Sequence, residues 1–550
     1  WDLMHKSQQE AGLPYIMFKD HVNATSMYSE HAIVQSSNLC CEITEPAGVA
    51  DGVRKFIEAC QSRGVITSED IDHYETTLAD EFSAPLPSNF HDMTLKQQVD
   101  TMRDNERETA VCNLGSIGLP AHLKLISSSD DTEDDTAQCK YTLDLHSIHE
   151  TAAFLVQQLD IVIDRNYYPE EMPQSGSSTL RSNMRHRPVA IGFSGLANVL
   201  QKLRIPFDSP EAVDLSGRIM QAIDHGSLVG SCERAKTHGP FPTWEGSPAH
   251  SGLFHFELVQ RHWVESGRAA VWFSLSESDR VVPTNLAYAP PTVNLEWDYE
   301  SYRGVPVRNR VRTALMPTAT TAQMLGFSES FDPMTANVTV RRVLSGTFTR
   351  VNSDLFELMA SRGLWTPTNR NNLRRDRSSV ANIEGLTDHE KAVFKTAWEM
   401  DMVPQMQAYR ARQPFVCQAQ SFNVFRPNPT DDELTDIHLW MWRGGCPNGS
   451  YYVRRKPALE AQQVTLENED NMSLSVAQER LDTFLINLFS AVDEDDDEAG
   501  EEEKQEVVEE VVEEEEKQEV VEEEQNTDDD VVDYGVCELG PGGADCEACQ

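Results

Sequence analysis

The spacing of hydrophobic and polar residues changes several times along the chain, and each change predicts a different kind of element. Residues 14–18 form an apolar run of strand length, and a second extended stretch ends at Ile43. Residues 1–46 are therefore predicted to be rich in strands. Residues from about 47 to 106 are charged, with helical spacing over 53–62 and 68–82 and weak core character.

Clearer periodicity follows in the middle of the chain. Residues 143–163 have the spacing of an amphipathic helix that ends at the polar and proline-containing stretch 166–169. Residues 190–203 are apolar around Gly192 and Gly195, which predicts a strand, a turn and a helix. Residues 240–306 are predicted to be rich in loops, and regular patterning resumes to about residue 465. Alternation of short strands and helices predicts an α/β fold.

Charge is concentrated at the C-terminal end. The net charge is −44, and residues 493–550 contain 27 acidic residues against two lysines. Residues 501–510 recur without change at 514–523. Such charge density opposes collapse, so 491–536 are predicted to be a disordered acidic linker, with 466–490 as a connecting segment and 537–550 as a separate cysteine-containing tail. An acidic balance in both parts argues against nucleic acid as a partner.

The remaining composition describes a protein of ordinary globular character. The chain has no apolar window near the ~18 residues that a membrane span needs and no N-terminal signal pattern, so no membrane partner is expected. Its 11 cysteines are scattered without a regular framework. This usage favours a reducing, cytoplasmic compartment in which single thiols serve chemistry or packing.

Residues 37–43, which read SNLCCEI, place three chemically different groups in one short segment. Alternate side chains of an extended strand share a face, so Asn38, Cys40 and Glu42 are predicted to point the same way. They offer a hydrogen-bond donor, a thiol for redox or radical chemistry and a general base. A buried strand with a satisfied polar edge explains this segment equally well.

A second cysteine stands in residues 108–117, which read ETAVCNLGSI and predict an apolar strand ending at a glycine turn. This cysteine is Cys112. Taken together and in this order, the two segments resemble the active-site signatures of the large subunits of ribonucleotide reductases. Residues 185–197, 239–248 and 341–348 resemble further segments of that family in its eukaryotic and viral style.

The resemblance runs from about residue 10 to 465 and returns at the last few residues. It implies the C-terminal part of a ten-stranded α/β barrel with a central finger loop, followed by the acidic tail. Residues 1–465 would form this barrel portion. The stretch between Cys40 and Cys112 is longer than family members usually have, so 47–106 are interpreted as an insertion on the barrel rim.

Residues 314–323, which read ALMPTATTAQ, have the signature of a helix N-terminus, with proline followed by hydroxyl residues. Free backbone N–H groups at such an end bind phosphate readily, although an ordinary capped helix gives the same pattern. The family holds its substrate diphosphate with a matching loop. The resemblance therefore implies a diphosphate site at Thr318, Ala319, Thr320 and Thr321.

Tyr451 and Tyr452 are adjacent, which in most proteins marks core or edge-strand aromatics. In the family, the matching pair relays a radical between the small subunit and the active-site cysteine. The sequence departs just upstream, because Pro447 and Asn448 stand where the family usually has lysine and threonine. The relay itself looks intact, while the supporting loop is reworked.

Cys546 and Cys549 form a terminal C-x-x-C pair that suits either half of a zinc site or thiol–disulfide exchange. Exchange is favoured, because only Cys537 lies near as a further ligand, and the family ends in such a redox pair. No metal site is expected. His146, His149 and Glu150 are interpreted as a solvated helical face. The remaining cysteines of note are interpreted as packing residues: Cys41, Cys60, Cys139, Cys232, Cys417 and Cys446.

The resemblance implies a mechanism. Cys40 becomes a thiyl radical and removes the 3′ hydrogen of a ribonucleoside diphosphate, with Glu42 as base on the 3′ hydroxyl and Asn38 hydrogen-bonded to the ribose. A dithiol that includes Cys112 drives the loss of water from C2′. The resulting disulfide is reduced by Cys546 and Cys549, which a thioredoxin or glutaredoxin reduces in turn.

The resemblance also implies components beyond this sequence. The partner of Cys112, the ATP and dNTP effector sites and the first half of the barrel are expected upstream of Trp1, so the chain is expected to be inactive alone. The radical is expected from a metal-containing small subunit, with no cofactor bound in this chain, and the complete large subunit is expected to be a homodimer. The rival hypotheses are a degenerate homologue kept as an interaction protein and the cobalamin-dependent class, which has no need of a tyrosine relay.

Overall fold

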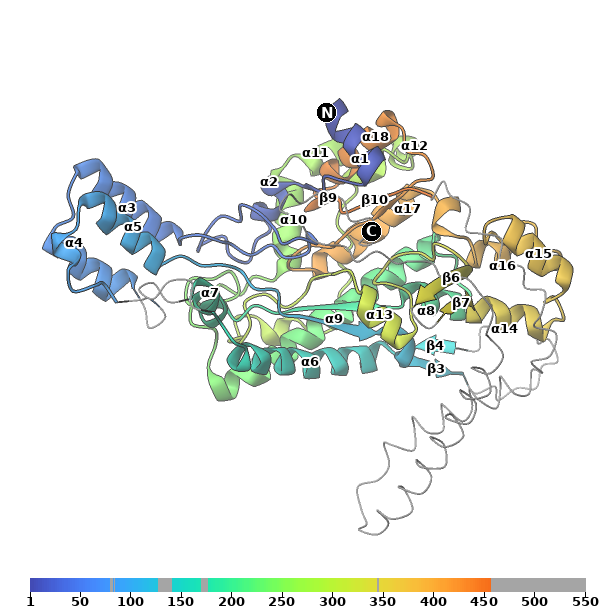
Figure 1. Ribbon diagram of the computed structural model, residues 1–550, viewed down its shortest axis with the longest axis horizontal. Coiled ribbons are helices and arrows are strands. Elements are labelled where there is room, and N and C mark those ends of the chain that lie inside the picture. The colour runs from blue at the N-terminus through green and yellow to red at the C-terminus, as the bar shows by residue number, and fades with distance from the viewer. Residues whose placement is uncertain (80–82, 84, 127–140, 170–176, 344–345, 457–550) are drawn as a thin grey trace, which may run out of the picture. The chain divides into compact units, whose positions relative to one another are not determined.

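The computed structural model describes residues 1–79, 83, 85–126, 141–169, 177–343 and 346–456 (Figure 1). All of them belong to the first of two compact units, Trp1–Gln463. The predictions for the connecting segment, the acidic linker and the terminal cysteines lie outside the described residues. None of the described helices is both long enough and apolar enough to cross a membrane.

Parallel strand pairings form the frame of the unit. β2 (Leu114–Gly118) pairs in parallel with β5 (Ala190–Ser194). On its other side, β5 forms a parallel bridge from Ile191 to Thr313. A further parallel bridge joins Leu315 to Gln420, and β8 (Val424–Phe425) pairs in parallel with β10 (Val453–Arg454). Segments distant in sequence therefore lie side by side, as an α/β barrel requires. A ring of ten strands stays a prediction.

Long helices cover these strands. α6 (Leu145–Arg165) packs along α9 (Pro210–His238), which in turn contacts α17 (Met402–Arg412). Gly226 and Gly230 of α9 allow the close approach, because a Cβ at either would lie within 2.2 Å of a carbonyl oxygen of α6. The helix predicted over 143–163 is confirmed as α6, and the strand–turn–helix predicted over 190–203 is confirmed as β5, Gly195 and α8 (Leu196–Lys202).

The prediction of a strand-rich N-terminal region is wrong. α1 (Asp2–Ala11) and α2 (Lys19–Ala24) are helices, and β1 (Ile16–Met17) is the short strand between them. α1 ends at Gly12, whose φ of 74° is the left-handed conformation that suits a helix C-terminus. The apolar run 14–18 indicated a strand, but its pairing extends over two residues because the chain enters α2 immediately afterwards.

Residues 49–106 contain a hydrophobic core of their own. α3 (Asp51–Arg63), α4 (Ser68–His73) with the π-helical turn Tyr74–Leu78, and α5 (Leu95–Asn105) appear in blue in Figure 1. The helical character predicted here is confirmed, whereas the weak core is wrong. Charged residues dilute the apolar positions in the sequence, yet nine buried side chains meet in one cluster: Val53, Ile57, Cys60, Ile66, Ile71, Tyr74, Phe90, Val99 and Met102.

The region predicted to be loop-rich, 240–306, also contains helices between its proline and glycine turns. These are α10 (His255–Glu265), α11 (Arg268–Ser274) and α12 (Glu277–Arg280). The other described elements are α7 (Ser178–His186), α13 (Ala319–Leu325), α14 (Ser353–Ser361), α15 (Pro367–Arg375), α16 (Asp388–Val393), α18 (Asp431–Arg443), the antiparallel pairs β3 (Leu123–Leu125) with β4 (Tyr141–Leu143) and β6 (Val338–Val343) with β7 (Gly346–Val351), and β9 (Asn448–Ser450).

Candidate active site

Cys40 lies in a tight turn rather than in the extended strand that the sequence predicted. The backbone N–H of Cys41 donates to the carbonyl of Asn38 at 3.2 Å, and Cys41 has a left-handed φ of 65°. The alternation of faces was therefore the wrong reason for the grouping. Asn38 and Glu42 still come together, because the turn reverses the chain and brings the fifth residue back onto the first.

Glu42 is a buried carboxylate held from two directions. The side-chain amide of Asn38 donates to its Oε1 at 2.8 Å, and the hydroxyl of Ser421 donates to its Oε2 at 3.2 Å. Burial raises the pKa of Glu42, while the hydrogen bonds from Asn38 and Ser421 oppose that rise. A buried carboxylate whose pKa is raised is a stronger base than an exposed one.

The turn is fastened by residues more than 370 positions away in the sequence. Ser421 Oγ donates to the carbonyl of Cys40 at 2.6 Å, and the amide of Asn448 donates to the carbonyl of Cys41 at 2.8 Å. The hydroxyl of Tyr409 donates to Asn448 Oδ1 at 2.8 Å, which fixes that amide. The reworked position Asn448 is thus part of the support of the thiol turn.

A group of three tyrosines reaches the thiol through Tyr451. The hydroxyl of Tyr451 lies 3.5 Å from the sulfur of Cys40, and the Tyr451 and Tyr452 rings have centroids 4.6 Å apart. Tyr15, which the sequence analysis missed, contacts both rings. The antiparallel pairing of β1 with β9 brings it there, since Ile16 is opposite Ser450. The one available signal was an aromatic residue inside the apolar run 14–18.

Cys112 belongs to the same electrostatic neighbourhood. The sequence predicted Cys112 within a strand, but it lies two residues before β2, and its side chain is exposed. The pKa of its thiol is nevertheless raised to about 11, first by partial removal from water and then by the negative charges of Glu42 and Glu45, while a hydrogen bond from Asn38 lowers it. The two thiols, the amide and the carboxylate are therefore grouped.

Comparisons with known proteins agree with this chemistry. Residues 1–452 match the family model described as ribonucleotide reductase, barrel domain. The chain belongs to this family. The ribonucleoside-diphosphate reductase large subunit of Dictyostelium discoideum is 32% identical over 473 residues, which are 85% of this chain and 43% of that protein. That of Arabidopsis thaliana is 31% identical over 482 residues, 85% of this chain and 47% of that protein.

The chain thus spans about half the length of the curated relatives that it matches. Among solved structures, it is similar to the Actinobacillus ureae class Id ribonucleotide reductase alpha subunit, with a TM-score of 0.50 and 21% identity over 83% of this chain and 61% of that chain. This likeness supports the fold assignment.

The reductase barrel places α13 close to the thiol turn through a continuous set of backbone hydrogen bonds. The N–H of Ala419 donates to the carbonyl of Glu42 at 2.9 Å, and Leu315 N–H donates to the carbonyl of Ala419 at 3.0 Å. Leu315 is three residues before Thr318, the residue that precedes α13. Ile43 also packs with Ala314 in one apolar cluster.

The four residues predicted to hold diphosphate divide into two kinds. Thr318 is buried, and its hydroxyl accepts from the N–H of Ser330 at 2.8 Å instead of capping α13. Ala319, Thr320 and Thr321 form the exposed first turn of α13. Their backbone N–H groups and the two hydroxyls are therefore at the surface of the reductase barrel, where an anion can reach them.

A second charged group lies at the ends of residues 49–106, where Gly48 and Glu108 meet. Glu108 accepts from Arg185 at 2.9 Å, from His31 at 3.0 Å and from His186 at 3.1 Å, and its backbone bridges Gly48. Burial raises the pKa of Glu108, but the imidazoles of His186 and His31 hold it well below its usual range. Although His31, Glu108 and His186 are metal-ligand types, the carboxylate is already satisfied by these donors.

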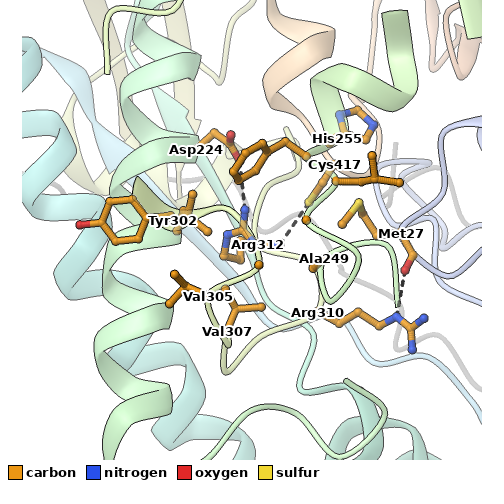
Figure 2. A pocket seen from close by; sticks show the side chains of 15 residues that line it. Met27, Asp224, Ala249, His255, Tyr302, Val305, Val307, Arg310, Arg312 and Cys417 are labelled. Atoms are coloured by element: carbon orange, nitrogen blue, oxygen red, sulfur yellow. Dashed lines mark hydrogen bonds and ion pairs between the residues drawn. The ribbon is translucent and has the colours of Figure 1, made fainter. Parts of the chain in front are cut away.

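A small cavity of about 20 Å³ lies elsewhere in the barrel (Figure 2). Figure 2 shows Arg312 reaching toward Asp224 and Arg310 toward the backbone of Met27. The nitrogen–oxygen distances are 3.5 and 3.0 Å. Such a volume holds about one water molecule. It is too small for a nucleotide, and none of the predicted site residues lines it.

The lesser sequence interpretations are partly confirmed. Five of the six cysteines interpreted as packing residues are buried, namely Cys41, Cys60, Cys232, Cys417 and Cys446. Cys139 lies outside the described residues, as do Cys546 and Cys549. The solvated histidine face is wrong for His149, whose ring stacks on Trp297 at 4.2 Å and hydrogen-bonds His225 at 2.8 Å, because α9 packs against this side of α6.

Proposed function

We propose that this chain carries the catalytic barrel of a ribonucleoside-diphosphate reductase large subunit. The single observation that carries the proposal is the contact of Cys40 Sγ with Tyr451 Oη at 3.5 Å, next to the hydrogen-bonded pair Asn38 and Glu42. A thiol in contact with a phenol and beside a base meets the needs of radical transfer and proton abstraction together.

The chemistry begins when a radical reaches Tyr451 from Tyr452. Tyr451 takes a hydrogen atom from Cys40, and the thiyl radical so formed takes the 3′ hydrogen of the ribose. Glu42 accepts the 3′ hydroxyl proton while Asn38 hydrogen-bonds the sugar. The C2′ hydroxyl then leaves as water, with its proton supplied by a dithiol that includes Cys112. The dithiol gives two electrons and becomes a disulfide, and its second hydrogen goes to C2′. Glu42 returns its proton to the 3′ oxygen, and the 3′ hydrogen returns from Cys40.

Substrate is a ribonucleoside diphosphate whose diphosphate binds at the first turn of α13. Thr320 and Thr321 offer hydroxyls, and the free N–H groups of Ala319 and its neighbours supply an uncharged anion site at a helix start. Thr318 supports this turn without contacting the diphosphate, since its hydroxyl accepts a hydrogen bond from the backbone of Ser330. An uncharged site of this kind suits a protein whose net charge is −44.

The remaining components follow from the family. A metal-containing small subunit supplies the radical, and ATP and dNTP effectors act on the large subunit, which works as a homodimer in the cytoplasm. Cys546 and Cys549 reduce the disulfide of Cys112 and its partner, and a thioredoxin or glutaredoxin reduces them in turn. Residues 47–106 are an insertion on the barrel rim.

The rival hypothesis of an inactive interaction protein depends on the reworked loop before Tyr451. The structure gives this loop a part in the site, because Asn448 supports the carbonyl of Cys41 and is itself fixed by Tyr409. A degenerate site has no reason to keep such a support. The observation therefore favours the enzyme.

The test measures reduction of CDP by the full-length large subunit with its small subunit and dithiothreitol. Cys40→Ser is expected to abolish turnover, and Glu42→Gln to lower it by about 10²-fold or more. Cys41→Ser is the matched control, because Cys41 is the adjacent buried thiol and is expected to leave turnover nearly unchanged. Full activity of Cys40→Ser, or none in the parent protein, would overturn the proposal.

A further inference from the structure

Tyr15 contacts both members of the tyrosine pair, and neither the mechanism nor the sequence motifs account for it. Its ring centroid lies 4.6 Å from that of Tyr451 at an interplanar angle of 45°, and 5.0 Å from that of Tyr452 at 82°. Since the Tyr451 and Tyr452 centroids are 4.6 Å apart, each of the three rings contacts the other two. We call these residues the tyrosine triangle.

The surrounding backbone holds Tyr15 in this place. The side-chain amide of Gln8, which is fully buried, donates to the carbonyl of Pro14 at 2.9 Å and to Ser450 Oγ at 3.3 Å. A Cβ on Gly12 would lie 3.3 Å from the Tyr452 ring, so the absence of a side chain leaves room for that ring. Gln8 thus ties the residue before Tyr15 to the strand that precedes the tyrosine pair, and Gly12 leaves space for the ring of Tyr452.

The phenol of Tyr15 is linked to both partners by more than packing. Its pKa is raised above the ordinary value, first by burial and then by hydrogen bonding to Tyr452, whereas its hydrogen bond to Tyr451 acts in the opposite direction. The pKa of Tyr451 is raised as well, by burial and by its contact with Cys40. Tyr15 and Tyr451 therefore keep their protons at neutral pH.

Oxidation of a phenol releases an electron and a proton together, so each transfer needs a proton acceptor in a fixed position. In the first step, the Tyr452 radical takes a hydrogen atom from Tyr451; in the second, the Tyr451 radical takes one from Cys40. Tyr15 undergoes no net oxidation in either step. Its hydroxyl can accept or donate a hydrogen bond at each moment when a partner loses or gains its proton.

We propose that Tyr15 is a positioning residue of the tyrosine relay, whose hydroxyl orients Tyr451 and Tyr452 for transfer between them. This inference rests on the proposed reductase function. Because the ring and the hydroxyl of Tyr15 can be separated by substitution, the two contributions are testable independently of each other.

The experiment compares Tyr15→Phe, which keeps the ring, with Tyr15→Leu, which removes it, in the full-length subunit with its small subunit. Tyr15→Phe is expected to lower kcat for CDP by about tenfold or more without changing KM or the melting temperature, because substrate binding does not involve it. Tyr288→Phe, on a turn outside the tyrosine triangle, is the control and is expected to keep parental kcat.

A second readout is spectroscopic. Tyr452 is replaced by an easily oxidised tyrosine analogue, and the radical trapped there is measured by electron paramagnetic resonance. Tyr15→Phe is expected to change the proton hyperfine couplings of that radical, because a hydrogen bond is lost. Parental kcat and unchanged couplings in Tyr15→Phe would overturn the inference, even if Tyr15→Leu is inactive. Absence of turnover in the parent protein would instead overturn the proposed function.

Discussion

The side-chain amide of Asn38 donates a hydrogen bond of 2.8 Å to the carboxylate of Glu42 across the turn that presents Cys40. This contact makes the two residues a coupled pair, since it stabilises the charged form of a buried carboxylate. Burial raises the pKa of Glu42, and the amide restrains that rise.

Asn38→Ala is therefore expected to raise the pKa of Glu42 further. If deprotonated Glu42 is the base, the acidic limb of the profile of kcat/KM against pH moves to higher pH, and the maximum rate falls by about 10–100-fold. Ser421→Ala removes the weaker hydrogen bond to the same carboxylate and is expected to shift the limb in the same direction by less. If the acidic limb stays at the same pH in both variants, a group other than Glu42 is responsible for it.

The thiols are expected to differ in their reaction with iodoacetamide. Burial and the charges of Glu42 and Glu45 raise the pKa of Cys112 to about 11, and Cys41 is buried with a pKa raised to about 12. Because the thiolate is the nucleophile, alkylation of exposed Cys112 should accelerate about tenfold per pH unit between pH 8 and 10, while Cys41 stays unlabelled in the folded protein.

Peptide mapping by mass spectrometry gives both rates in one sample. Glu42→Gln is the informative variant, since it removes one of the negative charges that disfavour the thiolate and should speed the alkylation of Cys112 at pH 8. A rate that is independent of pH above 8 would show that the thiol of Cys112 ionises in the ordinary range or below it.

Local patterns were enough to predict some elements but not others. The amphipathic repeat of α6 and the apolar strand before Gly195 are strong signals, and both elements are confirmed. The prediction for the N-terminal region was wrong because α1 is polar on most of its surface. Its buried residues are covered by α18, which its own sequence does not show. Tertiary contact decides such segments.

The site was predictable in its chemistry and not in its geometry. Asn38, Cys40 and Glu42 were chosen for their residue types, which the motif supplies, whereas a strand was expected where the chain makes a turn. Ser421 and Tyr15 could not be predicted from the sequence, because serines and tyrosines are common. Each reaches the site through a contact with a residue far away in the sequence. Sequence patterns predict functional groups more readily than the residues that hold them.

The separate core of residues 49–106 predicts local rather than global destabilisation. Ile57 is 1% exposed within that core, so Ile57→Ala is expected to cost about 2–5 kcal/mol in its stability. Hydrogen exchange followed by mass spectrometry should show faster exchange in α3 and α5 with unchanged protection in α6 and α9. Faster exchange in all four helices would mean that residues 49–106 and the rest of the described unit unfold together.

Two glycines in helices are expected to respond to alanine with opposite signs. A Cβ on Gly230 would lie 2.1 Å from the carbonyl oxygen of Ala153, so Gly230→Ala forces α9 away from α6 and should destabilise the protein by about 1–3 kcal/mol or more. Gly52 in α3 has nothing within 4 Å of the same position. Gly52→Ala should therefore stabilise its helix by about 0.5–1 kcal/mol. Chemical denaturation of both variants measures the contrast, and equal effects would contradict the close packing of α6 and α9.

Buried histidines are expected to make the folded state sensitive to mild acid. Burial lowers the pKa of His255 from 6.5 to about 4, so in this range the unfolded chain binds a proton that the folded chain does not. The contribution of His255 to stability is therefore complete above pH 6.5 and declines as the pH falls toward 4, by up to about 1.4 kcal/mol per pH unit.

His255→Gln should make the dependence of the unfolding free energy on pH shallower by up to one proton between pH 4 and 6.5. Exposed His146 is the matched control, and His146→Gln should leave the slope unchanged. If the slope is the same in both variants, His255 takes up its proton without unfolding, and the cavity beside it must admit water or an anion to stabilise the charge.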